Sequence, residues 1–284
     1  MRPFCLMRPG GLTARPHEAT IPVIAGVQTI HPVQTIHPAR FGDELLATIG
    51  GMLVPYGPLD ILDPFAGTGR VHELRSLGHR TLGVEIEPAW ASLHPGTVCG
   101  NSLHLADVLA GCRFDAIVTS PVYGNRMSDA HDNRDTCKAC AGTGAVGTGV
   151  AGNGRCRTCL GSGISMRRSY THDLRRMTGD PSAKLHPDNA GQMQWGKGYK
   201  DFHEKVWAQA PALLKGPKLF VLNCKDHVRN RERQRVVDWH VETLENLGFT
   251  VERREQVDTG GMRHGSNRER YSEEIVLLRG TDRR

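Results

Sequence analysis

The sequence contains no long apolar run and few aromatic residues. Nowhere in its 284 residues do apolar side chains approach the run of about 18 that a transmembrane helix needs. The first twenty residues carry Arg and Pro but no apolar core, so we expect no secretory signal, a cytoplasmic location and no membrane partner. Apolar residues (38%) and charged residues (23%) are near globular averages, which excludes collagen-like, coiled-coil and wholly disordered chains.

A disulfide framework is also not expected. Eight cysteines in a chain expected in the cytoplasm favour a metal site over disulfides. The 14 histidines show no ligand spacing of their own. The net charge of +6 is compatible with a polyanionic partner, although many ordinary enzymes are equally basic.

Apolar runs bounded by Gly and Pro alternate with amphipathic stretches over most of the chain. This alternation predicts an α/β, Rossmann-like sheet of seven strands, with the last two strands antiparallel neighbours. Gly50 and Gly51 are expected to end the first helix. The expected strands are 59–65, 80–88, 95–102, 114–121, 218–226, 249–257 and 273–280, and the expected helices are 41–49, 69–78, 201–215 and 236–248.

The alternation breaks after the fourth expected strand. Residues 124–200 are too polar and too rich in glycine to build a large core, so they are predicted to be an insertion that needs outside support. The sheet domain would then comprise 28–123 and 201–284. Residues 1–27, which show no periodicity, are expected to form a flexible arm.

A glycine-rich turn, Asp63-Pro-Phe-Ala-Gly-Thr-Gly69, joins the first strand to the next helix. Glycines let the backbone turn tightly against a ligand, and the helix start offers N–H groups to ligand oxygens. A dinucleotide fold wants a third glycine, where this chain has His72, so NAD is disfavoured. Glu85, at the end of the second expected strand, can accept both hydroxyls of a ribose.

The segments DPFAGTG, VEIEP and TSPVY resemble the S-adenosylmethionine-dependent DNA methyltransferases that modify exocyclic amines. The resemblance implies a Rossmann-like methyltransferase sheet and S-adenosylmethionine as cofactor. In this family an acid more often stands where this chain has Asn101, the residue implied to contact adenine. The segment from Ile36 to Phe41 resembles the motif that closes over the methionine end. The cofactor-binding residues so implied are His37, Phe41, Asp63, Phe65, Gly67, Gly69, Glu85 and Asn101.

The catalytic motif is expected to be Ser120-Pro-Val-Tyr123, at the end of the fourth strand. A base amine is a poor nucleophile because its lone pair is delocalised, so acceptors on its two hydrogens would aim the lone pair at the methyl group. Ser120 Oγ and the Pro121 carbonyl are suitable acceptors, and Tyr123 offers a flat face for an extruded base. No cysteine follows a proline, which disfavours methylation at cytosine C5.

The resemblance favours N4 of cytosine in double-stranded DNA as the target, with N6 of adenine next. Val122 departs from the second proline of the family motif. An RNA or another amine as substrate is one alternative. The other is a catalytically weakened, zinc-dependent nucleic-acid-binding protein, which only Val122 supports. The basic groups at 167–168, 175–176 and 229–235 are candidate phosphate contacts.

Four cysteines within the insertion have a metal-binding spacing. They lie in the paired segments CKACAGTG and CRTCLGSG, and four thiolates suit a tetrahedral structural zinc. The segments resemble the cysteine-rich repeats of J-domain co-chaperones, but the chain has two repeats and no J helix, so a chaperone function is not implied. The expected ligands of this zinc ribbon at 137–163 are Cys137, Cys140, Cys156 and Cys159.

Overall fold

The computed structural model describes most of the chain. It covers residues 41–124, 137, 139–146, 154–156, 163, 170–180, 182–229, 232–258 and 272–281. The predicted arm, His37 and Cys159 lie outside these described residues.

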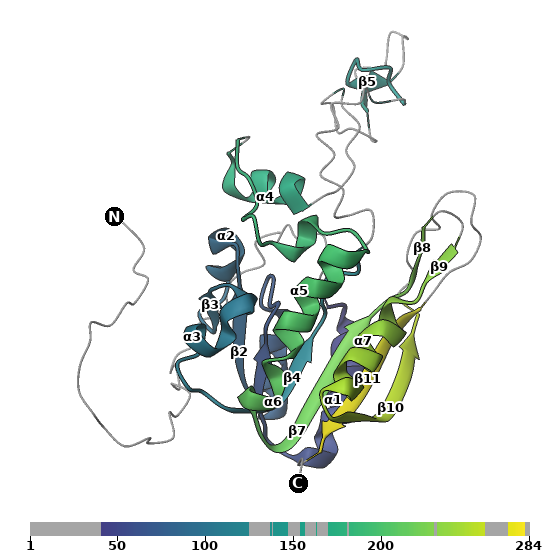
Figure 1. The fold of residues 1–284 in the computed structure, drawn as a ribbon. Coiled ribbons are helices and arrows are strands. Elements are labelled where there is room, and N and C mark those ends of the chain that lie inside the picture. Colours follow the sequence, from purple (N-terminus) through teal and green to yellow (C-terminus); the bar gives the residue numbers. More distant parts are fainter. Residues whose placement is uncertain are drawn as a thin grey trace.

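A seven-stranded sheet forms the centre of the molecule (Figure 1). Its order is β10-β11-β7-β4-β1-β2-β3. Neighbours from β3 to β7 are parallel, whereas β11 pairs antiparallel with both β7 and β10. This confirms the predicted α/β, Rossmann-like sheet and its antiparallel final pair. The bounds are β1 Asp60–Asp63, β2 Arg80–Glu85, β3 Thr97–Cys99, β4 Phe114–Thr119, β7 Leu214–Cys224, β10 Phe249–Val257 and β11 Glu273–Gly280.

Helices cover both faces of this sheet. Successive strand residues point to opposite faces, so Leu62 and Leu222 join one apolar cluster, and Ile61 and Val221 join another. The first cluster includes side chains of α5 (Lys197–Trp207), α6 (Ala210–Leu213) and α7 (Val236–Asn246). The second packs under α1 (Asp43–Leu53) and the 3-10 helix η2 (Arg70–Leu77). The carboxyl ends of the parallel strands remain available for a ligand.

The first helix does not end where the glycines predict. α1 runs from Asp43 through Gly50 and Gly51 to Leu53, so the expected stop is wrong. Its buried face continues past the glycines with Met52 and Leu53. A Cβ atom at Gly50 would lie 2.6 Å from Leu77 Cδ1, so this glycine permits close packing of α1 on η2.

Two further elements differ from expectation in type or extent. The helix predicted at 69–78 is a 3-10 helix, and Gly78 ends it in the left-handed conformation. The helix predicted at 201–215 begins earlier, at Lys197, and gives way to α6 and then to β7 at Leu214. The buried residues Ala210, Leu213 and Leu214 continue the apolar pattern beyond α5, so the local sequence did not show where the helix ends.

Between β4 and β7 the described residues form small elements outside the main sheet. β5 (Ala145–Val146) and β6 (Gly154–Arg155) pair antiparallel, and α4 (Tyr170–Thr178) packs on α2 (Pro88–Ala91). A second hairpin follows β7 and projects beside α7 (Figure 1). The remaining elements are η1 Val54–Tyr56, η3 Ser102–His104, α3 Leu105–Val108, η5 Ala190–Gln192, β8 His227–Arg229 and β9 Glu232–Gln234.

Candidate cofactor and catalytic site

A pocket opens at the carboxyl ends of β1, β2 and β4. Its lining brings together six of the predicted site residues from separate segments: Phe41, Phe65, Gly67, Glu85, Asn101 and Ser120. Asp63, Gly69, Pro121 and Tyr123 are not part of this lining, although each adjoins a lining residue.

The glycine-rich turn is tied directly to the end of β2. Gly67 has φ of 53°, a left-handed conformation that favours glycine, and its N–H donates to Glu85 Oε2 at 2.9 Å. The N–H of Glu87 donates to the other carboxylate oxygen, also at 2.9 Å. Glu85 is thus fixed by backbone donors at the pocket wall, where its oxygens can accept further hydrogen bonds from a ligand.

Asp63 lies beneath the same turn and is 1% exposed. Its Oδ1 accepts from Phe65 N and from Thr119 Oγ1, but its buried Oδ2 has no hydrogen-bond partner among the described residues. A buried acceptor without a partner is costly, so a ligand donor or a water is expected there. The pocket therefore fits a ligand that brings hydroxyls to Glu85, and Asp63 Oδ2, beneath the lining, still lacks a hydrogen-bond donor among the described residues.

Burial also changes the acidity of these two carboxyls. Burial raises the pKa of Asp63 to about 7 and that of Glu85 to about 8. The buried histidines act in the opposite sense, because desolvation lowers the pKa of His72 to about 2 and that of His203 to about 4. The histidines therefore lose their protons on folding at acidic pH, and the two carboxyls keep theirs nearer to neutrality.

We predict that the ligand-free protein loses stability as the pH rises from about 6.5 to about 8. Across this window the folded chain holds carboxyl protons that the unfolded chain has already released, so the free energy of unfolding falls. Below about pH 6.5 the buried histidines oppose this effect, because there the unfolded chain binds protons that the folded chain does not. At about 1.4 kcal/mol per pKa unit, the decline should be about 2 kcal/mol. Urea denaturation at several pH values measures it. Glu85→Gln should flatten the slope, and a variant with the wild-type slope would contradict the assignment.

The far wall of the pocket was not predicted. Tyr170 of α4 packs on Trp90 of α2 with ring centroids 6.2 Å apart, and both side chains line the pocket. Glu87 Oε1 accepts from His186 N at 2.8 Å and from Asn189 Nδ2 at 2.6 Å. These contacts hold the segment around 185–191 against the end of β2.

A carboxylate from this segment meets Asn101. Asn101 Nδ2 donates to Asp188 Oδ2 at 2.8 Å, and both residues line the pocket. Asn101 Oδ1 accepts from Leu103 N, which begins η3. Sequence analysis missed Asp188 because 87 residues separate it from Asn101.

The predicted catalytic motif joins a polar cluster at the ends of β4 and β7. Tyr123 Oη lies 3.1 Å from Ser120 Oγ and donates to Glu273 Oε2 at 2.6 Å. Asn223 Nδ2 donates to both hydroxyl oxygens, at 3.3 Å for Ser120 and 3.2 Å for Tyr123. Burial raises the pKa of Tyr123 well above its usual value, so its hydroxyl stays protonated. Neither Asn223 nor Glu273 was among the predicted site residues.

A second chain of hydrogen bonds holds the carbonyl of Val122. Tyr199 Oη donates to Val122 O at 2.5 Å and also lies 2.8 Å from His240 Nε2. Trp207 Nε1 donates to His240 Nδ1 at 3.0 Å, so the neutral histidine carries its proton on Nε2 and donates to Tyr199. Burial lowers the pKa of His240 well below its usual value, which agrees with this neutral form. The Val122 carbonyl is thus held by a hydrogen bond at the position where the family motif has its second proline.

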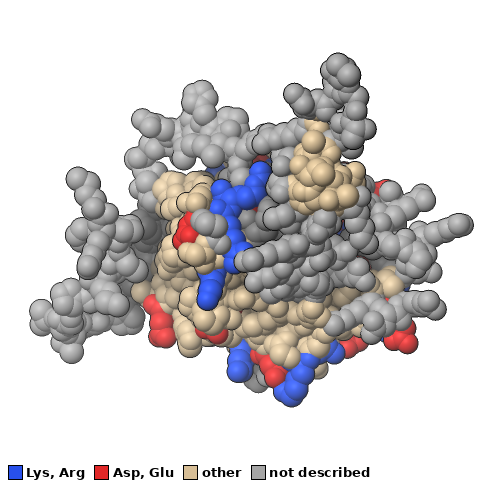
Figure 2. All heavy atoms as spheres, turned by 90° about the horizontal axis from the view of Figure 1, so that it is seen from above, with Lys and Arg blue, Asp and Glu red and all other residues tan. Residues whose placement is uncertain are grey.

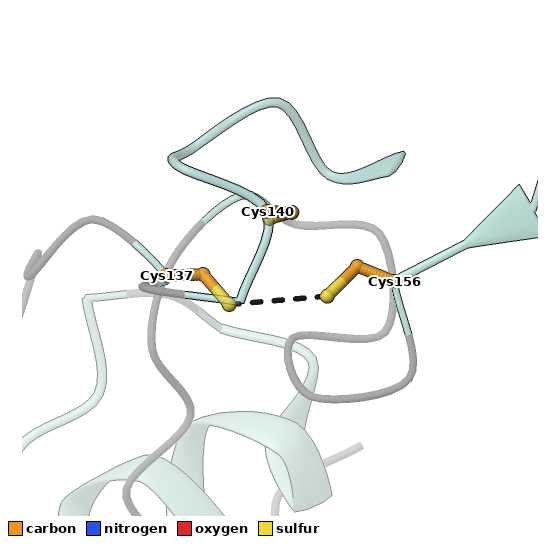
Figure 3. Close-up of side chains that lie close together, drawn as sticks. All are labelled: Cys137, Cys140 and Cys156. Carbon is orange, nitrogen blue, oxygen red and sulfur yellow. Dashed lines mark hydrogen bonds between the residues drawn. The ribbon is translucent and has the colours of Figure 1, made fainter. Parts of the chain in front are cut away.

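Three of the four predicted zinc ligands lie close together. The sulfurs of Cys137, Cys140 and Cys156 are within 4.8 Å of one another, and all three side chains are buried (Figure 3). The two repeats bond reciprocally: Cys137 N donates to Gly163 O, and Cys156 N donates to Gly144 O, each at 2.8 Å. Each repeat thus ends on a glycine whose carbonyl receives the first cysteine of the other. Cys159, the remaining predicted ligand, lies outside the described residues.

The last glycine of the second repeat allows this close approach. Gly163 has φ of 72°, and a Cβ atom there would lie 2.2 Å from Gly142 O. No side chain fits at that distance. Gly163 is therefore required by the fold of the ribbon, besides any metal.

The end of the molecule that carries α4 is seen from above in Figure 2. A band of Lys and Arg atoms crosses its described surface, and α4 carries Arg175 and Arg176 in its last turn. The predicted basic positions 167–168 lie outside the described residues. None of the helices that are described combines the length and apolar composition needed to cross a membrane.

The last strand of the chain, β11, lies between β7 and β10 and runs antiparallel to both. This strand order is typical of the class I methyltransferase fold. No protein-family model matches the chain, and no curated protein does.

Several solved structures align with most of this chain at TM-scores below 0.5. An S-adenosylmethionine-dependent methyltransferase from Clostridium acetobutylicum has a TM-score of 0.44 at 11% identity, over 84% of this chain and 92% of that one. TrmN from Thermus thermophilus has a TM-score of 0.43 at 13% identity, over 84% of this chain and 49% of that one, so the matched part spans about half of TrmN. A 1,6-didemethyltoxoflavin-N1-methyltransferase from Burkholderia thailandensis has a TM-score of 0.42 at 16% identity, over 84% and 80%.

Proposed function

We propose that the chain is an S-adenosylmethionine-dependent methyltransferase that modifies an exocyclic amine of a base in double-stranded DNA, with N4 of cytosine favoured and N6 of adenine next. The observation that carries this proposal is the pocket that joins the glycine-rich turn and Glu85 to Ser120. The wall formed by the turn and Glu85 suits a cofactor with a ribose. Ser120, on the adjoining wall, offers a hydrogen-bond acceptor for the reacting amine.

The residues present fit this cofactor. The unpartnered Oδ2 of Asp63 suits an α-amino group at the methionine end, and Glu85 suits the ribose hydroxyls. Asn101 and Asp188 offer polar groups for adenine. His37, also implied by the resemblance, stays a prediction. When bound, S-adenosylmethionine supplies an electrophilic methyl group on a sulfonium.

The chain's own part in the reaction is to hold the amine. Ser120 Oγ and the Pro121 carbonyl accept hydrogen bonds from its two hydrogens, which favours a pyramidal nitrogen with a directed lone pair. Tyr123 keeps the serine in place through the 3.1 Å contact between their oxygens. The fixed carbonyl of Val122 limits the freedom of the same loop.

The direct test is to incubate the protein with labelled S-adenosylmethionine and unmethylated duplex DNA, single-stranded DNA or RNA, followed by mass spectrometry of the nucleosides. We expect N4-methylcytosine from duplex DNA. N6-methyladenine would correct the assigned base and leave the mechanism in place. A methylated product from RNA alone would show that the substrate is RNA. 5-methylcytosine would overturn the mechanism, because that reaction needs a cysteine nucleophile.

We predict that Ser120→Ala lowers the turnover number by about 10²-fold, the usual effect of removing one preorganised hydrogen-bonding group from an active site. The affinity for S-adenosylhomocysteine should stay within about twofold, because the proposed partner of Ser120 is the base amine. Ser76→Ala, an exposed serine on η2, is the matched control and should leave turnover unchanged. Full turnover by the Ser120 variant would remove this residue from catalysis.

We further propose that the cysteine cluster binds one structural zinc and positions residues 124–200 for DNA recognition. Cys159 has the same place in CRTCLGSG as Cys140 has in CKACAGTG, which supports Cys159 as the fourth ligand. Four thiolates leave no open position for an activated water, so the metal would have no part in the chemistry.

A further inference from the structure

The proposed reaction releases a proton from the methylated amine, and another group has to accept it. When the amine nitrogen bonds to the methyl carbon, the C–S bond breaks and its electron pair stays on sulfur. The nitrogen then bears a positive charge and must lose one hydrogen. The further inference rests on the proposed function and concerns where that proton goes.

A directed chain of hydrogen bonds leads away from the pocket. Asn223 Nδ2 can only donate, and it lies 3.3 Å from Ser120 Oγ, 3.2 Å from Tyr123 Oη and 3.4 Å from Glu273 Oε2. Tyr123 donates to Glu273 Oε2 at 2.6 Å, which leaves the Ser120 hydroxyl to donate to Tyr123 at 3.1 Å. The two hydroxyls thus donate in one direction, from the pocket wall to the Glu273 carboxylate.

We infer that Ser120, Tyr123 and Glu273 form a proton relay, in which Glu273 is the final acceptor of the proton lost by the methylated amine. The amine proton moves to Ser120 Oγ as the serine proton moves to Tyr123 Oη and the tyrosine proton moves to Glu273 Oε2. Both hydroxyls end neutral, and the Glu273 carboxylate becomes a carboxylic acid. Its proton later exchanges with solvent.

The surroundings of Glu273 suit this acceptor. Its side chain is 12% exposed, so it is largely shielded but still reaches water. The titratable groups that face it are the Tyr123 hydroxyl from the end of β4, and the Cys224 thiol and the Lys225 ammonium from the end of β7. Lys225 Nζ is 4.0 Å from Glu273 Oε1 and favours the ionised carboxylate.

Burial outweighs that attraction and raises the pKa of Glu273 above its usual value. A carboxylate with a raised pKa is a better base, and it is protonated at a less acidic pH. The turnover number of the wild-type protein should therefore fall as the pH is lowered into the range where Glu273 becomes protonated.

The test combines Glu273→Gln with Tyr123→Phe, which keeps the aromatic ring but removes the hydroxyl. Each variant should lower the turnover number by about 10²-fold, the scale of general acid–base catalysis, with little change in affinity for S-adenosylhomocysteine. The double variant should be no slower than either single variant, because both break the same relay. Glu273→Gln should also remove the acidic limb of the pH profile.

Glu274→Gln is the matched control, because Glu274 is the next residue of β11 and pairs with Arg254. Its turnover and pH profile should equal those of the wild type. An active wild type whose Glu273→Gln variant keeps the turnover number and acidic limb would overturn the relay alone, even if that variant melts earlier. Additive losses in the double variant would do the same. A wild type that transfers no methyl group to any nucleic acid would overturn the proposed function and the relay with it.

Discussion

Cys137→Ser combined with Cys140→Ser is expected to abolish DNA binding while sparing cofactor binding. The two sulfurs are buried beside Cys156, and the ribbon has little other apolar content to hold it. Zinc binding contributes on the order of 10 kcal/mol to the folding of small zinc modules, so its loss should unfold residues around 130–165. Elemental analysis should find one zinc per wild-type chain and none in the variant. DNA affinity, measured by fluorescence anisotropy, should fall by at least about 10²-fold.

Cys99→Ser combined with Cys112→Ser is the matched control. Both cysteines lie outside the ribbon and are not buried, so zinc content and DNA affinity should not change. Calorimetry with S-adenosylhomocysteine should give equal affinities for wild type and both double variants. A metal-free protein that resists protease across 130–165 and binds DNA with full affinity would refute the zinc assignment.

Gly67→Val is expected to abolish cofactor binding. Gly67 has a left-handed φ of 53°, which costs other residues about 1–2 kcal/mol and a β-branched residue more. Gly67 also lines the pocket, so a branched side chain there would take up space that the ligand needs. A shift of the turn would break the bond from Gly67 N to Glu85 as well. Calorimetry with S-adenosylhomocysteine should show a loss of more than about 10²-fold in affinity.

Gly78→Val separates backbone strain from loss of the site. Gly78 has φ of 88° and ends η2 on the surface, and a Cβ atom at this position would meet no other atom within 4 Å. The substitution should lower stability by a similar amount but leave cofactor affinity intact. If both valine variants bind the cofactor as the wild type does, the turn is not part of the site.

The parts of the site that sequence analysis predicted are those carried by single short segments. The turn ending at Gly69 and the acid at Glu85 follow buried apolar runs, and the carboxyl ends of parallel strands meet at one edge. Asn223, Glu273 and Asp188 were missed because each reaches its partner across a long separation. Tyr123 and Glu273, for example, are 150 residues apart.

The same distinction explains the errors in the predicted helices. A glycine pair signals a helix end locally, but Gly50 serves the packing of α1 on Leu77, a contact between separate elements. The end of α5 was misplaced because the buried apolar residues Ala210, Leu213 and Leu214 continue past it, through α6 to the first residue of β7. Nothing in the local sequence of α4 predicted that its Tyr170 would contact Trp90.

If the chain methylates DNA as proposed, the wall that α4 and the segment at 185–191 contribute to the pocket limits how it could acquire a new target sequence. Exchange of the whole stretch between β4 and α5 with that of another enzyme would remove Tyr170, Asp188 and Asn189 together. Such a chimera should no longer bind S-adenosylmethionine, so its DNA specificity could not be measured. A graft confined to residues 125–169 would leave that wall in place, so new specificities are more readily reached by changes within the ribbon than by replacement of the insertion.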